Sequence, residues 1–152
     1  MQRINWTRII LGGLLAGVVI NISEALVNGL WLADSWAAAM RNLGRSPNLG
    51  ALSNVIFILW GFLIALFAMW LYATIRPRFG PGPRTAIIAA IATWVPGSLL
   101  SMMAPIAMHL FPRRLLAIGI VEALVELIVG VLLGAWLYKE KGPAAAANTM
   151  GG

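Results

Sequence analysis

The sequence predicts an all-α fold, an integral membrane bundle of four transmembrane helices, and three observations support this prediction. Hydrophobic residues make up 61% of the 152-residue chain and charged residues only 11%, against about 45–50% and about 25% in ordinary globular proteins. The mean hydropathy is +0.87. The apolar residues form four unbroken runs, each near the ~20 residues that cross a bilayer. Because a small soluble domain buries only about 60–70% of its unfolded surface, this composition excludes a soluble enzyme, a nucleic-acid-binding module and a disordered chain.

The four spans are expected at residues 7–32, 54–75, 84–110 and 115–138. They are continuous apolar runs, unlike the short alternating strands of an outer-membrane barrel. With their connections they form a single domain, 1–141, followed by a disordered alanine-rich tail, 142–152. A short interfacial helix is expected at 35–43, in the first connection. Pro96 and Pro105 are expected to kink the third span, because proline removes a hydrogen bond from the helical backbone.

Positively charged residues predict the orientation of the spans, since cytoplasmic segments of membrane proteins carry an excess of Lys and Arg. Seven such residues lie at the amino terminus, in the second connection or after the fourth span, and four lie in the other two connections. The seven are Arg3, Arg8, Arg76, Arg78, Arg84, Lys139 and Lys141. Both termini are therefore expected in the cytoplasm. The four spans, with a stretch rich in Arg, Pro and Gly between the second and third, resemble small bacterial inner-membrane proteins, which implies a multi-pass protein of a bacterial-type inner (plasma) membrane.

Two of the spans carry small and polar residues on one helical face. In the first span, spacings of four, four, three and four place five residues within an arc of about 80°. They are Gly13, Gly17, Asn21, Glu24 and Asn28. In the fourth span, five residues fall within an arc of about 120°. They are Gly119, Glu122, Glu126, Gly130 and Gly134.

The depths of these residues predict how the two spans pack. Gly13 and Gly17 in the first span, and Gly130 and Gly134 in the fourth, form Gly-x-x-x-Gly pairs in the same half of the membrane. Such pairs let two helix backbones approach closely in lipid, so the first and fourth spans are expected to cross there. The other half of the membrane then holds a polar cluster. Its expected members are Glu24, Glu122, Glu126, Asn21 and Asn28, with Asn54 and His109 as further contributors from the span ends.

Buried carboxylates are costly, at about 2.5–3.5 kcal/mol each near mid-membrane, and three interpretations are open. The acids can form a polar clamp, hydrogen-bonded to the asparagines and to one another. They can bind a proton or a cation. They can also hold a metal or a redox cofactor, although the sequence requires no cofactor and leaves the metal unknown. The chain has no cysteine and a single histidine, which excludes thiolate metal sites, iron–sulfur clusters and haem with two histidine ligands.

Catalytic residues are not evident, because the spans contain no Ser/His/Asp set and no phosphate-binding glycine loop. The sequence therefore favours a non-enzymatic, small polytopic membrane protein that acts through helix association. It would be a homo-oligomer or an accessory subunit of a larger membrane complex, with the lipid bilayer and itself or another membrane subunit as partners, and no nucleic acid. The alternative function is a proton- or cation-coupled small transporter or channel that uses the Glu cluster.

Overall fold

The computed structural model describes residues 4–138, and every regular element within them is a helix. The elements, in chain order, are α1 (Trp6–Leu26), η1 (Val27–Trp31), α2 (Ala33–Asn42), α3 (Gly50–Phe79), α4 (Pro83–Trp94), η2 (Val95–Leu100), α5 (Met103–Ala107) and α6 (Arg113–Leu137). The two elements η1 and η2 are π-helical segments. The predicted all-α class is thus confirmed for the described residues. The predicted tail, 142–152, lies outside them, as do Arg3, Lys139 and Lys141.

Four helical segments are long and apolar enough to cross a membrane, as the sequence predicts. They are Trp6–Trp31, Gly50–Phe79, Pro83–Ala107 and Arg113–Leu137. The second extends beyond the predicted 54–75 at both ends. At its carboxyl end the helical hydrogen bonds continue past the apolar residues and through Pro77, until Gly80 ends the helix with a φ of 84°. Hydropathy predicts only where the apolar part of a helix ends. The helix itself ends at Gly80, whose positive φ stops the helical backbone.

Both prolines of the third apolar segment lie where its helix changes geometry. Pro96 lies in η2 and Pro105 in α5, so the α-helical ladder is interrupted as predicted, because proline has no N–H to donate. The Ser101 hydroxyl donates to the backbone carbonyls of Gly97 (2.8 Å) and Ser98 (3.0 Å). A side chain of the same segment therefore satisfies carbonyls near the irregular turn.

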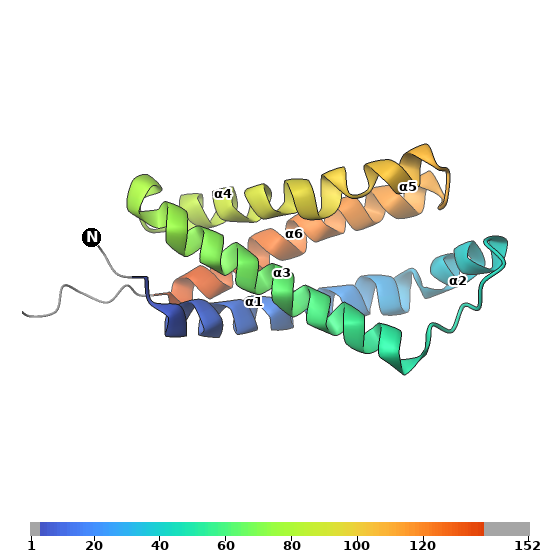
Figure 1. Ribbon diagram of the computed structural model, residues 1–152, viewed down its shortest axis with the longest axis horizontal. Coiled ribbons are helices and arrows are strands. Elements are labelled where there is room, and N and C mark those ends of the chain that lie inside the picture. Colours follow the sequence, from blue (N-terminus) through green and yellow to red (C-terminus); the bar gives the residue numbers. More distant parts are fainter. Residues whose placement is uncertain (1–3, 139–152) are drawn as a thin grey trace, which may run out of the picture.

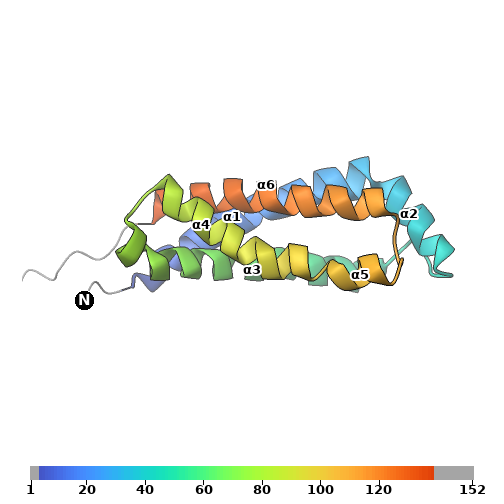
Figure 2. The ribbon, with the colours of Figure 1, turned by 90° about the horizontal axis from the view of Figure 1, so that it is seen from above.

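The four long segments run alternately up and down along one axis (Figures 1 and 2). Helix α1 packs against α3 and α6, and α4 packs against the same two helices from the other side. The two ends of the described chain meet at one end of the bundle, where the Arg8 guanidinium donates to the Leu137 carbonyl (3.4 Å). Helix α2 lies at the opposite end (Figure 1).

Helices α1 and α6 approach each other at glycine. A Cβ atom on Gly134 would lie 2.6 Å from the Gly12 carbonyl oxygen, and one on Gly130 would lie 3.2 Å from the Ala16 carbonyl oxygen. Met69 of α3, fully buried, covers this contact, since its sulfur would lie 2.7 Å from the same Cβ on Gly134. The α1–α6 contact is therefore made by Gly12 and Ala16 on one side and Gly130 and Gly134 on the other.

Gly13 and Gly17 do not make this contact, which corrects the predicted pairing. A Cβ atom on Gly13 would meet the Leu66 side chain, and one on Gly17 would overlap the Phe62 ring, both on α3. The physical reason is that neighbouring residues of a helix point about 100° apart. Since α1 lies between two helices, it uses one small-residue stripe against α6 and the adjacent stripe against α3.

Candidate cation site

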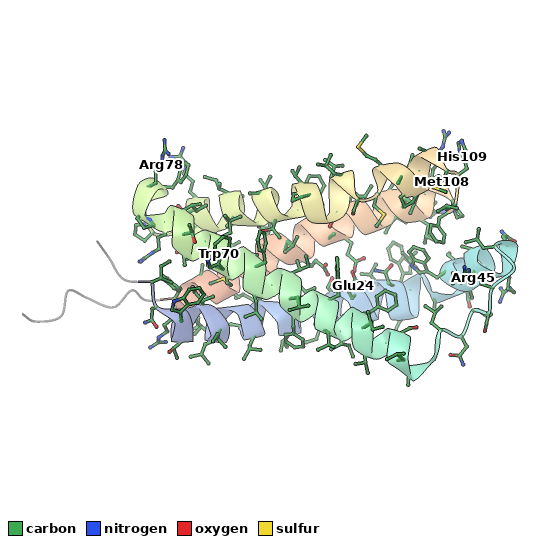
Figure 3. All side chains as sticks on the ribbon, viewed as in Figure 1. Glu24, Arg45, Trp70, Arg78, Met108 and His109 are labelled. Carbon is green, nitrogen blue, oxygen red and sulfur yellow. The ribbon has the colours of Figure 1, made fainter. Side chains whose placement is uncertain are left out.

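Three carboxylates converge between α1 and α6. Glu122 and Glu126 are four residues apart and therefore lie on one face of α6, and the antiparallel α1 places Glu24 opposite them. The three side chains offer carboxylate oxygens that all lie within 4.8 Å of one another. Figure 3 shows Glu24 within the length of the bundle, away from the ends at which Arg45, Arg78 and His109 lie.

The three carboxylates differ in burial. The exposed fractions of Glu122 and Glu126 are 9% and 7%, whereas Glu24 is exposed. Neither α1 after Arg8 nor α6 after Arg114 carries a Lys or Arg. The site therefore runs from an exposed acid to two buried ones and has no basic residue on either helix beside it.

An amide group bridges two of the acids. The Asn28 Nδ2 atom donates to Oε2 of Glu24 and to Oε2 of Glu122, both at 2.7 Å. The Ser23 hydroxyl donates to the other oxygen of Glu122 (3.3 Å). The Trp36 indole Nε1 donates to Asn28 Oδ1 (2.9 Å). Because an indole N–H can only donate, Trp36 fixes the amide so that its NH₂ group faces the carboxylates.

Glu126 has an oxygen that these interactions do not reach. Its Oε2 atom is buried and has no hydrogen-bond partner among the described residues. An unsatisfied buried polar group costs about 1–3 kcal/mol, and such groups are rare enough in folded proteins to need an explanation. If the three acids served only to clamp the helices by hydrogen bonds, this oxygen should have a hydrogen-bond partner.

Asn21, predicted to join the cluster, lies elsewhere. Its Nδ2 atom donates to the Gly17 carbonyl (2.8 Å) and to the Ile58 carbonyl of α3 (3.3 Å). Gly61 of α3 makes room for the amide, since a Cβ there would lie 2.8 Å from Asn21 Nδ2. Asn21 follows Gly17 by one helical turn and so continues the stripe that faces α3.

The two other predicted contributors are also separate from the carboxylates. Asn54 is exposed in the first turns of α3. His109 is exposed in the turn after α5, with a φ of 52°, at an end of the bundle (Figure 3). Within residues 4–138, the group of His, Cys, Asp and Glu side chains close enough to share a metal ion is Glu24, Glu122 and Glu126 alone.

Two residues of the site, Ser23 and Trp36, are absent from the predicted set. Ser23 follows Ala16 by seven residues, so it lies on the α6-facing stripe, and that spacing is a signal by which it could have been found. Trp36 comes from α2 and looks in the sequence like a residue of the interfacial belt. It packs edge-on against Phe111 (ring centroids 5.5 Å apart). Its indole reaches Asn28, eight residues earlier, from α2, which continues beyond η1 at the end of the bundle (Figure 1).

The atoms that the site offers to a ligand are all carboxylate oxygens. Carboxylate oxygens are hard ligands that suit protons and cations such as Mg²⁺, Ca²⁺ and Mn²⁺. Comparisons of the chain with protein-family models, with curated proteins and with solved structures find no match.

Proposed function

We propose that this protein is a multi-pass inner-membrane protein of bacterial type that works as a small proton- or cation-coupled transporter or channel, with Glu24, Glu122 and Glu126 as its ion-binding site. The observation that carries the proposal is the buried, unpartnered Glu126 Oε2 beside two further carboxylates. A bound ion would satisfy this oxygen.

A purely structural clamp is less consistent with the same geometry. Helices α1 and α6 already pack closely through Gly12, Ala16, Gly130 and Gly134, so they need no acids to hold them together. Each carboxylate at depth in a membrane costs about 2.5–3.5 kcal/mol. A cluster that keeps three acids and leaves one oxygen unsatisfied is more consistent with ligand binding.

The local backbone and the charge distribution also support the proposal. Asn28 lies in η1, and π-helical turns occur frequently at functional sites. Glu24 is the exposed acid of the three, and Glu122 and Glu126 are buried, so an ion that binds all three would pass from Glu24 to the buried pair. The excess of Lys and Arg near the chain ends and the second connection supports cytoplasmic termini, which would place the carboxylates in the outer half of the membrane.

Flux in liposomes tests this function. We expect Glu24→Gln, Glu122→Gln and Glu126→Gln each to reduce proton or cation flux at least about tenfold, since the amide keeps the size of the side chain but cannot carry the charge that binds an ion. The measurement uses the purified chain, a pH-sensitive dye and a cation-sensitive dye inside the vesicles. Asp34→Asn is the matched control, because Asp34 is an exposed acid on α2 outside the cluster. Flux equal to that of the unmodified protein in all three variants would reject the proposal.

Helix association, as a homo-oligomer or as an accessory subunit of a larger complex, is a second candidate function. The observation in its favour is the exposure of the first turns of α3, where Leu52 is 74% exposed, Phe57 60% and Trp60 59%. Lipid or another subunit must cover these side chains. If association is the function, native mass spectrometry of protein released gently from its own membrane should show multiples of 16.3 kDa or the added mass of a foreign polypeptide. A lone monomer would contradict this candidate.

A further inference from the structure

We propose that the ion held by Glu24, Glu122 and Glu126 is a hard divalent metal cation, of the class of Ca²⁺, Mn²⁺ and Mg²⁺, and not a proton. This inference rests on the proposed function, because it names the ion of the same site. Four features of the site support it: the spacing of the oxygens, their charge, the orphaned oxygen of Glu126 and the hydrogen bonds that orient the acids.

The spacing of the carboxylates fits a metal ion. Oxygens of all three lie within 4.8 Å of one another. Oxygens on opposite sides of a Ca²⁺ ion lie about 4.6–5.2 Å apart, because each Ca–O bond is about 2.3–2.6 Å long. Neighbouring ligands lie closer than that. One ion can therefore contact all three side chains with little movement, whereas a shared proton joins only two oxygens, at about 2.5–2.7 Å.

The charge of the cluster favours a divalent ion over a monovalent one. Three ionised carboxylates carry three negative charges, and the side chains that donate to them, Asn28 and Ser23, are neutral. No Lys or Arg lies on α1 after Arg8 or on α6 after Arg114. A divalent cation leaves one uncompensated charge and a monovalent cation leaves two, and uncompensated charge is costly where Glu122 and Glu126 are buried.

The orphaned oxygen is independent evidence for a ligand. Glu126 is 7% exposed, and its Oε2 atom has no partner among the described residues, so a ligand is the partner that the site lacks. The ligand atoms that the three acids offer are all oxygens. Thiolate ligands are excluded by the absence of cysteine. The imidazole of His109 lies at an end of the bundle. Carboxylate and water ligands suit hard cations such as Mg²⁺, Ca²⁺ and Mn²⁺.

The hydrogen bonds around the acids resemble the outer shell of a metal site. Ligating carboxylates in proteins are themselves hydrogen-bonded, and these bonds orient them toward the ion. Here Asn28 donates to one oxygen of Glu24 and one of Glu122, and Trp36 holds Asn28 in place. Each carboxylate keeps further lone pairs for a metal. Water molecules would complete the six to eight ligands that such ions take.

Metal binding to the full chain tests the inference directly. The protein is stripped of metal with a chelator, placed in nanodiscs of uncharged phosphatidylcholine and titrated with Mn²⁺ at fixed pH, and the electron paramagnetic resonance signal of free Mn²⁺ is followed. We expect one Mn²⁺ per chain, displaced by Ca²⁺ or Mg²⁺ but not by K⁺. Glu126→Gln should weaken this binding at least about tenfold, while Asp34→Asn should leave it unchanged.

The outcomes separate this inference from the function on which it rests. No Mn²⁺ binding at millimolar metal, or binding that Glu126→Gln leaves intact, overturns the divalent site. If proton flux still depends on the glutamates in that case, the proposed function stands without it. Mn²⁺ binding without any flux supports the site and rejects transport. A second variant, Glu126→Met, replaces the orphaned carboxylate by an apolar side chain, and its own melting transition shows that it is folded. Mn²⁺ should raise the melting temperature of the unmodified protein and not that of this variant.

Discussion

Replacing Glu126 with methionine should stabilise the metal-free protein and abolish its cation binding. Methionine has a similar length and shape and carries no buried oxygen that needs a partner. The unpartnered Glu126 Oε2 costs about 1–3 kcal/mol, and the substitution removes this cost. We therefore expect the free energy of unfolding in chelator to rise by up to this amount, as measured by thermal or denaturant unfolding in detergent micelles.

Glu122→Met is the matched control, because the two acids share a helix face and a similar burial. Glu122 accepts hydrogen bonds from Asn28 and Ser23, so its replacement removes both bonds and leaves Asn28 with Glu24 alone as acceptor. This variant should lose about 1–3 kcal/mol. If both variants change the free energy of unfolding in the same direction, the oxygens of Glu126 are hydrogen-bonded as well as those of Glu122. The unpartnered oxygen would then give no evidence for a missing ligand.

Adding Mn²⁺ should reverse the order of stability. A ligand that binds only the folded state stabilises it by mass action, so the unmodified protein gains stability while Glu126→Met does not. A residue that lowers stability without its ligand and is required for binding is typical of a functional site. The stabilities of the unmodified protein and of Glu126→Met, measured with and without Mn²⁺, thus give the effect of this carboxylate on folding and its effect on metal binding.

Hydropathy predicts the four long helices because the backbone of a lipid-embedded chain must satisfy its own hydrogen bonds, and a continuous apolar run can do so only as a helix. The same reasoning cannot place helix ends that lie outside the apolar region. Helix α3 continues through Pro77 to Phe79 and ends at Gly80, because its last turns depend on local hydrogen bonds and on a left-handed glycine rather than on hydropathy.

The carboxylate cluster is largely visible in the sequence, whereas its surroundings are not. The four-residue spacing of Glu122 and Glu126 and the antiparallel direction of the first span suffice to place Glu24 beside them. Periodicity does not reveal that α1 has two neighbours, so it cannot decide whether Asn21 faces α6 or α3. Trp36 reaches Asn28 from α2, across the π-helical turn η1 and the break at Leu32, and regular α-helical spacing does not predict this contact.

Adding one methyl group at Gly134 should destabilise the bundle. A Cβ atom there would lie 2.6 Å from the Gly12 carbonyl oxygen and 2.7 Å from the Met69 sulfur. The sulfur can shift, but the carbonyl belongs to the backbone of α1, so α1 and α6 must move apart. Overpacking of this kind costs about 1–3 kcal/mol, which exceeds the gain of up to about 1 kcal/mol from replacing glycine with alanine in a helix. The midpoint of unfolding of Gly134→Ala should therefore fall.

Gly119→Ala makes the same chemical change in the same helix, where a Cβ atom would meet nothing within 4 Å. It should keep or slightly raise the stability, because only the gain in helix propensity remains.

The two variants also show whether the α1–α6 contact affects metal binding as well as stability. Gly134 lies eight residues from Glu126, or about 12 Å along the helix, and takes no part in the cluster. If the close contact also sets the distance between Glu24 and the acids of α6, Gly134→Ala should weaken Mn²⁺ binding and Gly119→Ala should not. Equal stability and equal binding in the two variants would show that α1 and α6 do not pack at this distance.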